Sequence, residues 1–129
     1  MKKRVLLVFL CLIAVIGLTY GAKYLYDYKV YQSITSTLTI SNIDLSKVKD
    51  GTYIGEFDAK LVAAKTRVTV ENGKIINLEL LKHKNERGKD AEAILSKVVS
   101  EQSLDIDVVS GATNSSKVIL KSIENAFKE

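Results

Sequence analysis

The chain begins with a long apolar run, from Val5 to Ala22, that contains no charged residue and has Thr19 and Tyr20 as its clearly polar side chains. A helix of this length rises about 27 Å, close to the bilayer hydrocarbon thickness of about 30 Å. Basic residues occupy positions 2–4, so the positive-inside rule places the N-terminus in the cytoplasm. We therefore expect residues 1–4 to form a cytoplasmic basic end and residues 5–22 a single transmembrane anchor that contacts membrane lipid.

A cleaved signal peptide is the competing interpretation of this segment, and it requires small residues one and three positions before the cut. A cut after Ala22 would place Tyr20 at the third position, and a cut after Gly21 would place Thr19 there. Neither suits the cleavage rule, so the uncleaved anchor is preferred. The tyrosines at 20, 24, 26 and 28 then predict an aromatic belt at the outer membrane interface.

Residues 23–49 are expected to form a tether between the anchor and a folded domain. The helix is expected to continue through residues 23–32, and a Ser/Thr-rich stretch follows at 33–41. No Gly or Pro interrupts these residues. A helical stalk and a flexible linker are both compatible with this composition.

Residues 50–129 carry the pattern of a small folded domain. Alternating apolar and polar positions predict strands at 52–57, 61–70 and 74–81, the last directing Ile76, Leu78 and Leu80 to one face. Asn72-Gly73 is a strong signal for a tight hairpin between the second and third strands. The local pattern therefore predicts a three-strand antiparallel meander.

The second half of this domain has helical spacing. Residues 82–89 predict a polar, charged turn containing His83 and Arg87, and residues 90–102 a helix with Asp90 as its N-cap. Residues 104–108 alternate like a short strand, and residues 115–128 predict a final helix. Strands followed by helices predict an α+β fold, a small antiparallel sheet with two helices, preceded by one transmembrane helix.

Charge changes this picture by excluding one class of partner. Of the 19 basic residues, three precede the apolar run, and the charges of the remaining 16 are nearly balanced by 15 acidic residues. The part outside the membrane is therefore nearly neutral, which argues against binding to nucleic acid. The single cysteine, Cys11, lies within the apolar run, and His83 is the single histidine, so we expect neither a metal site nor a disulfide within the chain.

The segment Ser110-Gly111-Ala112-Thr113 precedes the last predicted helix and is the best candidate for chemistry. Gly111 permits a sharp turn and the close approach of a ligand. The free N–H groups and dipole of the helix that follows attract a phosphate or another anion. The hydroxyl groups of Ser110, Thr113, Ser115 and Ser116 can add hydrogen bonds to such a ligand. On these grounds alone, a phosphate seat and an ordinary helix cap both remain open.

A longer match points to a family. Asp107-Val108-Val109-Ser110-Gly111-Ala112-Thr113 resembles the Asp-x-x-Ser/Thr-Gly-Ala-Thr signature of the FMN-binding domain family. Residues 50–55 (Asp-Gly-Thr-Tyr-Ile-Gly) are similar to its opening motif, residues 68–75 to its central hairpin and residues 102–105 to the lead-in to the signature. The resemblance covers about residues 50–128. Residues 115–116 and 85–88 depart from common family patterns and place the chain nearest to short exported Gram-positive members.

The resemblance implies FMN as the cofactor, joined through its phosphate to Thr113 by a separate flavin transferase. Asp107, Ser110, Gly111 and Ala112 would then form the recognition sequence and immediate surroundings. The expected function is that of a membrane-anchored, extracytoplasmic electron carrier that meets membrane or extracellular redox partners, and an electron-transfer flavoprotein is favoured over a stand-alone enzyme with its own catalytic residues. A reversible FMN-binding or sensing module and a flavin-free cell-surface interaction domain are the alternatives.

Overall fold

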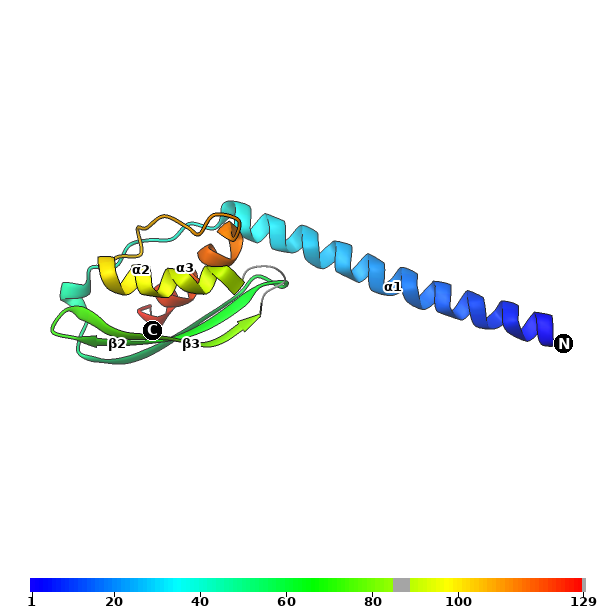
Figure 1. The fold of residues 1–129 in the computed structure, drawn as a ribbon, viewed down its shortest axis with the longest axis horizontal. Coiled ribbons are helices and arrows are strands. Elements are labelled where there is room, and N and C mark those ends of the chain that lie inside the picture. Colours follow the sequence, from blue (N-terminus) through cyan, green and yellow to red (C-terminus); the bar gives the residue numbers. More distant parts are fainter. Residues whose placement is uncertain (85–88, 129) are drawn as a thin grey trace.

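The computed structural model describes residues 1–84 and 89–128. A long helix leads into a small domain in which helices cover a sheet (Figure 1). The elements in chain order are α1 (Lys2–Thr37), the 3-10 helix η1 (Leu45–Lys47), β1 (Gly51–Asp58), β2 (Ala63–Glu71), β3 (Lys74–Lys84), the 3-10 helix η2 (Lys89–Ala93), α2 (Ile94–Glu101) and α3 (Thr113–Ala126). The predicted α+β class, with its apolar N-terminal helix, meander and two further helices, is confirmed.

The sheet is an antiparallel meander in the order β1-β2-β3. Asn72 and Gly73 join β2 to β3 with φ angles of 52° and 74°. Two successive left-handed residues are what a type I′ two-residue hairpin turn requires, and the twist of this turn matches that of the flanking strands. The predicted hairpin is therefore confirmed in both position and conformation.

The inward face of β3 differs from the prediction at one position. Val70 lies opposite Ile75 but Thr69 lies opposite Asn77, so the register shifts at Ile76. This β-bulge turns the side chain of Ile76 outward, so that Ile76 is 54% exposed, whereas Ile75 is only 3% exposed. Simple alternation cannot anticipate an inserted residue, and the expectation that Ile76 faces the core was wrong.

Both helices of the domain lie on the same side of the sheet. Helix α3 packs against β1 and β2, and α2 packs against β3. The core between the layers is aliphatic, and its members include Val68, Val70, Ile94, Ile119 and Ile123. The other sheet face carries polar residues such as Arg67 and Glu79, which form an ion pair at 3.1 Å. This one-sided burial is common in antiparallel sheets.

The segment after the third strand also differs from the prediction. Strand β3 continues to Lys84, so His83 lies in the sheet opposite Ala64 instead of in a polar turn. The His83 side chain is 2% exposed, and its Nδ1 lies 3.2 Å from Oε1 of Glu92. The partner strand β2 extends back to Ala63 and provides the ladder that residues 82–84 join. Arg87 lies outside the described residues.

Three features of the helical half differ from the prediction. The first helical segment begins at Lys89 as η2, which places Asp90 inside its first turn instead of at its N-cap. Residues 103–109 form no strand. In Figure 1 this orange segment crosses the helical layer on the side away from the sheet, so no strand edge is within reach. The final helix begins at Thr113, two residues earlier than predicted.

Helix α1 runs without interruption through the apolar run and on to Thr37. It is long and apolar enough to cross a membrane, and none of its most apolar window is buried within the chain. Its last turns do contact the domain, because Thr35 is buried and Tyr31 and Ile34 pack against the core. The helix therefore reaches the domain as a stalk that packs onto it.

The connection after α1 is held to α3 by a buried carboxylate. Glu124 is 1% exposed and accepts hydrogen bonds from the N–H of Ser41 at 3.1 Å and from Nζ of Lys121 at 3.0 Å. It also forms an ion pair with Lys128, and Lys121 donates to the Thr39 carbonyl at 3.1 Å. These contacts fix residues 39–41 against α3, and with them the end of the stalk.

Candidate functional site

The segment that precedes α3 is a tight turn. Gly111 has a φ of 80°, a conformation that favours glycine, and the N–H of Ala112 donates to the Val109 carbonyl at 3.0 Å. The buried hydroxyl of Ser116 braces this turn from inside: it donates to the Ala112 carbonyl at 2.8 Å and accepts from the N–H of Val109 at 3.2 Å. The Ser116 hydroxyl is therefore engaged by the turn itself, and the expectation that it could add a ligand hydrogen bond is wrong.

Thr113 is the first residue of α3, and its side chain is exposed. The first intrahelical hydrogen bond is donated by Ser116 to Ala112, so the N–H groups of residues 113–115 precede the helical ladder. The N-cap residue is Ala112, and no side-chain hydrogen bond caps this end of α3 within the described part of the chain. These donors and the positive end of the dipole of a 14-residue helix suit an anion.

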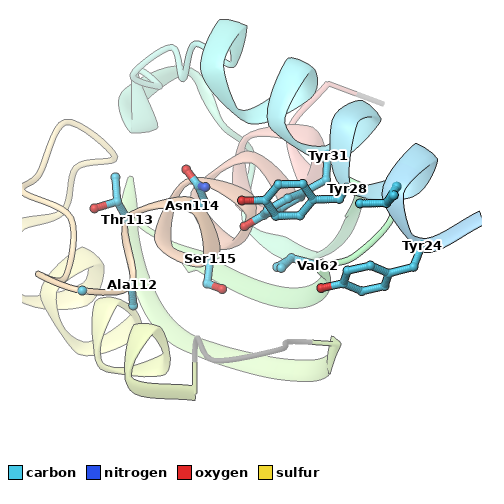
Figure 2. A pocket seen from close by; sticks show the side chains of 10 residues that line it. Tyr24, Tyr28, Tyr31, Val62, Ala112, Thr113, Asn114 and Ser115 are labelled. Carbon is cyan, nitrogen blue, oxygen red and sulfur yellow. The ribbon is translucent and has the colours of Figure 1, made fainter. Parts of the chain in front are cut away.

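A cavity of about 680 Å³ lies beside this helix end. That volume is within the range of small-molecule sites, about 300–1,000 Å³. Figure 2 shows tyrosines of α1 along one side of the cavity, with Val62 and residues 112–115 along the other. The lining residues are Tyr24, Leu25, Tyr28, Tyr31, Val62, Gly111, Ala112, Thr113, Asn114 and Ser115. The cavity thus combines an aromatic wall with a helix N-terminus.

The structure brings only some of the site residues predicted from the sequence to the cavity. Gly111, Ala112 and Thr113 line the cavity, whereas Asp107 and Ser110 are exposed and do not line it. The roles assigned to these residues remain predictions. Sequence reasoning missed the contributions of α1 and of Val62. The signal for the α1 contribution was the helical spacing of positions 24, 28 and 31, which places three tyrosines on one face.

Positive charge lies next to this cavity. A neighbouring shallow hollow shares Asn114 with it and carries Lys29 from α1 and Lys117 from α3. Both ammonium groups extend the anion-attracting character of the helix end. Among the described residues, no group of three or more His, Cys, Asp or Glu side chains could hold a metal ion.

Comparison with known families matches residues 63–128 to the FMN-binding domain. The match includes β2, β3, α2, α3 and the turn at Gly111. The chain belongs to the FMN-binding domain family. The turn and the uncapped helix end therefore lie within the matched part of the chain, whereas Val62 and the α1 residues that line the cavity lie outside it.

One relative adds a distant similarity. An uncharacterized protein of Treponema pallidum (strain Nichols) is 28% identical over 87 residues, which cover 65% of this chain and 24% of that protein. The chain thus spans about a quarter of the length of this relative.

Proposed function

We propose that this chain is a membrane-anchored, extracytoplasmic electron carrier whose FMN is linked through a phosphoester to Thr113. The observation that carries the proposal is the placement of Thr113, whose exposed hydroxyl-bearing side chain starts α3 and lines the cavity of an FMN-binding domain. An esterified phosphate at this oxygen would lie beside the N–H groups of residues 113–115. That placement would stabilise its negative charge.

The lining of the cavity supports a carrier over a stand-alone enzyme. It consists of aromatic, aliphatic, small and neutral polar residues, without a carboxylate, imidazole or basic side chain among the described residues. General acid–base catalysis commonly relies on such groups, and among the described lining residues the tyrosine phenols are the groups left for that role. The flavin supplies the redox chemistry when bound, and the protein contributes position and electrostatics.

In this proposal, the apolar part of α1 anchors the domain at a membrane. Residues 2–4 precede the apolar part of α1, so the positive-inside rule directs the N-terminus to the cytoplasm and the FMN-binding domain to the outer side. In this arrangement a flavin transferase would load the exported domain. Electrons would then pass between a membrane donor and an outside acceptor.

Intact-mass measurement tests the attachment. The full-length chain is co-expressed with a flavin transferase, alongside the variant Thr113→Val and the matched control Thr52→Val, whose threonine is exposed on β1. We expect wild type and the control to gain the mass of one FMN less one water, and Thr113→Val to gain nothing. An unmodified wild type, in cells where a known acceptor protein is labelled, would refute the covalent proposal.

The same samples separate the covalent carrier from a reversible FMN module. Under denaturing conditions a phosphoester keeps the flavin on the chain, whereas reversibly bound FMN is released. If the module is reversible, Thr113→Val should weaken FMN binding without abolishing it. Absence of flavin from wild type under every co-expression condition would instead favour the interaction domain.

A further inference from the structure

The juxtamembrane part of α1 has two kinds of tyrosine. Tyr24, Tyr28 and Tyr31 line the cavity, whereas Tyr20 and Tyr26 do not and are 72% and 67% exposed. An interfacial belt accounts for tyrosines that point around a helix in any direction. Such a belt does not explain why Tyr24, Tyr28 and Tyr31 all lie on the face of α1 that is turned toward α3 and the turn before Thr113, as Figure 2 shows.

The three rings form one continuous strip. The ring centroids of Tyr24 and Tyr28 are 6.4 Å apart, with an interplanar angle of 17°, and those of Tyr28 and Tyr31 are also 6.4 Å apart. The Tyr28 hydroxyl accepts a hydrogen bond from Nε2 of Gln32 at 2.8 Å, and Tyr31 packs against the domain core. These contacts hold the strip in place before any ligand arrives, which lowers the entropic cost of binding.

We propose that this strip is the surface on which the isoalloxazine ring of FMN stacks, so that the flavin is held between the stalk and the domain. The inference rests on the proposed function and deepens it. Thr113 and the helix end provide the phosphate seat, and Val62 and Ser115 lie between them and the tyrosines (Figure 2). A ribityl chain that crosses this floor brings the flat ring to the aromatic wall, where offset stacking is favourable.

This placement sets the height of the ring above the bilayer. At helical rise, Tyr24 lies about 3 Å and Tyr31 about 14 Å beyond Ala22, the last residue of the apolar run. Tyr31 and Ile34 pack the end of α1 against the core, and Glu124 holds the segment just after α1 to α3, so the tyrosine strip and the phosphate seat keep one geometry. A redox partner in the membrane then meets the flavin at the membrane surface.

Flavin fluorescence tests whether the isoalloxazine ring stacks on the tyrosine strip. A stacked tyrosine quenches an excited flavin by electron donation, and phenylalanine does not. The experiment uses the full-length chain, loaded by a flavin transferase and kept in detergent. The test variant carries Tyr24→Phe, Tyr28→Phe and Tyr31→Phe, which keep the aromatic rings and remove the hydroxyl groups. The matched control carries Tyr20→Phe and Tyr26→Phe on the same helix. FMN occupancy is measured by intact mass, and fluorescence is expressed per bound FMN.

We expect wild type and the control to be strongly quenched relative to free FMN, and the test variant to be several-fold brighter at unchanged occupancy. If the test variant and the control are equally bright, with FMN present on both, the stacking of the flavin on the tyrosines is refuted. The attachment of FMN at Thr113 is not affected by that result. If no FMN is present on wild type, both the proposed function and the stacking proposal are refuted. Occupancy and brightness thus separate the two outcomes.

Discussion

Replacing Gly55 by alanine should destabilise the domain, because α3 crosses β1 directly over this residue. A Cβ at position 55 would lie 1.9 Å from the carbonyl oxygen of Ser122 and 2.4 Å from the backbone nitrogen of Ala126. Both atoms belong to the backbone of α3, so no side-chain rotation can relieve the overlap. Gly55, the second glycine of the motif at residues 50–55, is therefore explained by the packing of α3 on the sheet.

The cost follows from the displacement that relieves this overlap. Non-bonded heavy atoms prefer separations of about 3.5 Å, so α3 must move away from β1 by about 1.5 Å. That movement loosens the contacts of buried α3 residues, among them Ile119 and Ile123. Overpacking of this kind costs about 3 kcal/mol. The entropy lost by the unfolded chain on Gly→Ala replacement opposes this, but by less than about 1 kcal/mol.

Thermal unfolding of the full-length protein in detergent, followed by near-ultraviolet circular dichroism, measures the effect. A net loss of about 2–3 kcal/mol lowers Tm by about 10–20 °C in a domain of this size. The matched control is Gly21→Ala, since an added Cβ there meets nothing within 4 Å. A Tm for Gly55→Ala within about 2 °C of wild type would refute the packing argument.

Two further predictions concern buried polar groups. Burial raises the pKa of Glu124, but hydrogen bonds from two lysines and a backbone N–H outweigh it and leave the pKa below the ordinary 4.5. The stabilisation is therefore complete above pH 4.5 and is lost as the pH falls through the lowered value. Glu124→Gln should cost about 2 kcal/mol at pH 7, because hydrogen bonds to a charged group are lost, and should reduce the loss on acidification to pH 3, measured by urea unfolding. Glu101→Gln, on the exposed end of α2, is the control, and an unchanged acid response in Glu124→Gln would contradict the assignment. Ser116→Ala should cost about 1–2 kcal/mol and lower FMN incorporation at Thr113, because the Gly111 turn loses its brace. Ser100→Ala, whose exposed hydroxyl bonds to the Lys97 carbonyl, should change neither quantity, and normal incorporation in Ser116→Ala would show that the brace is dispensable.

The features predicted correctly from the sequence are those that depend on near neighbours. Asn72 and Gly73 adopt left-handed conformations that few other residues tolerate, so they specify their turn without help from the rest of the chain. The alternation in β2 and the helical spacing in α3 record which side of each element is buried. The FMN signature was recognisable for a similar reason, because its residues are contiguous.

The errors arose where distant residues decide the conformation. Residues 104–108 have strand-like alternation, but they cross the helical layer and find no strand to pair with. His83 shows the reverse error. Its neighbours in the sequence are polar and predict a turn, yet it pairs with Ala64 of β2 in the sheet, and its side chain contacts Glu92. The outward turn of Ile76 depends in the same way on where β2 and β3 change register.

The candidate site divides along the same line. By itself, the sequence determined the family, the long apolar N-terminal helix and the presence of a helix soon after Gly111, because each depends on contiguous residues. Only the tertiary structure decided that tyrosines of α1 face that helix start across a cavity, since their contact joins segments separated by the whole sheet. The spacing of those tyrosines fits a membrane belt and a binding wall equally well. Their direction is settled by the packing of Tyr31 against the core and by the buried Glu124, which holds the segment just after α1 to α3.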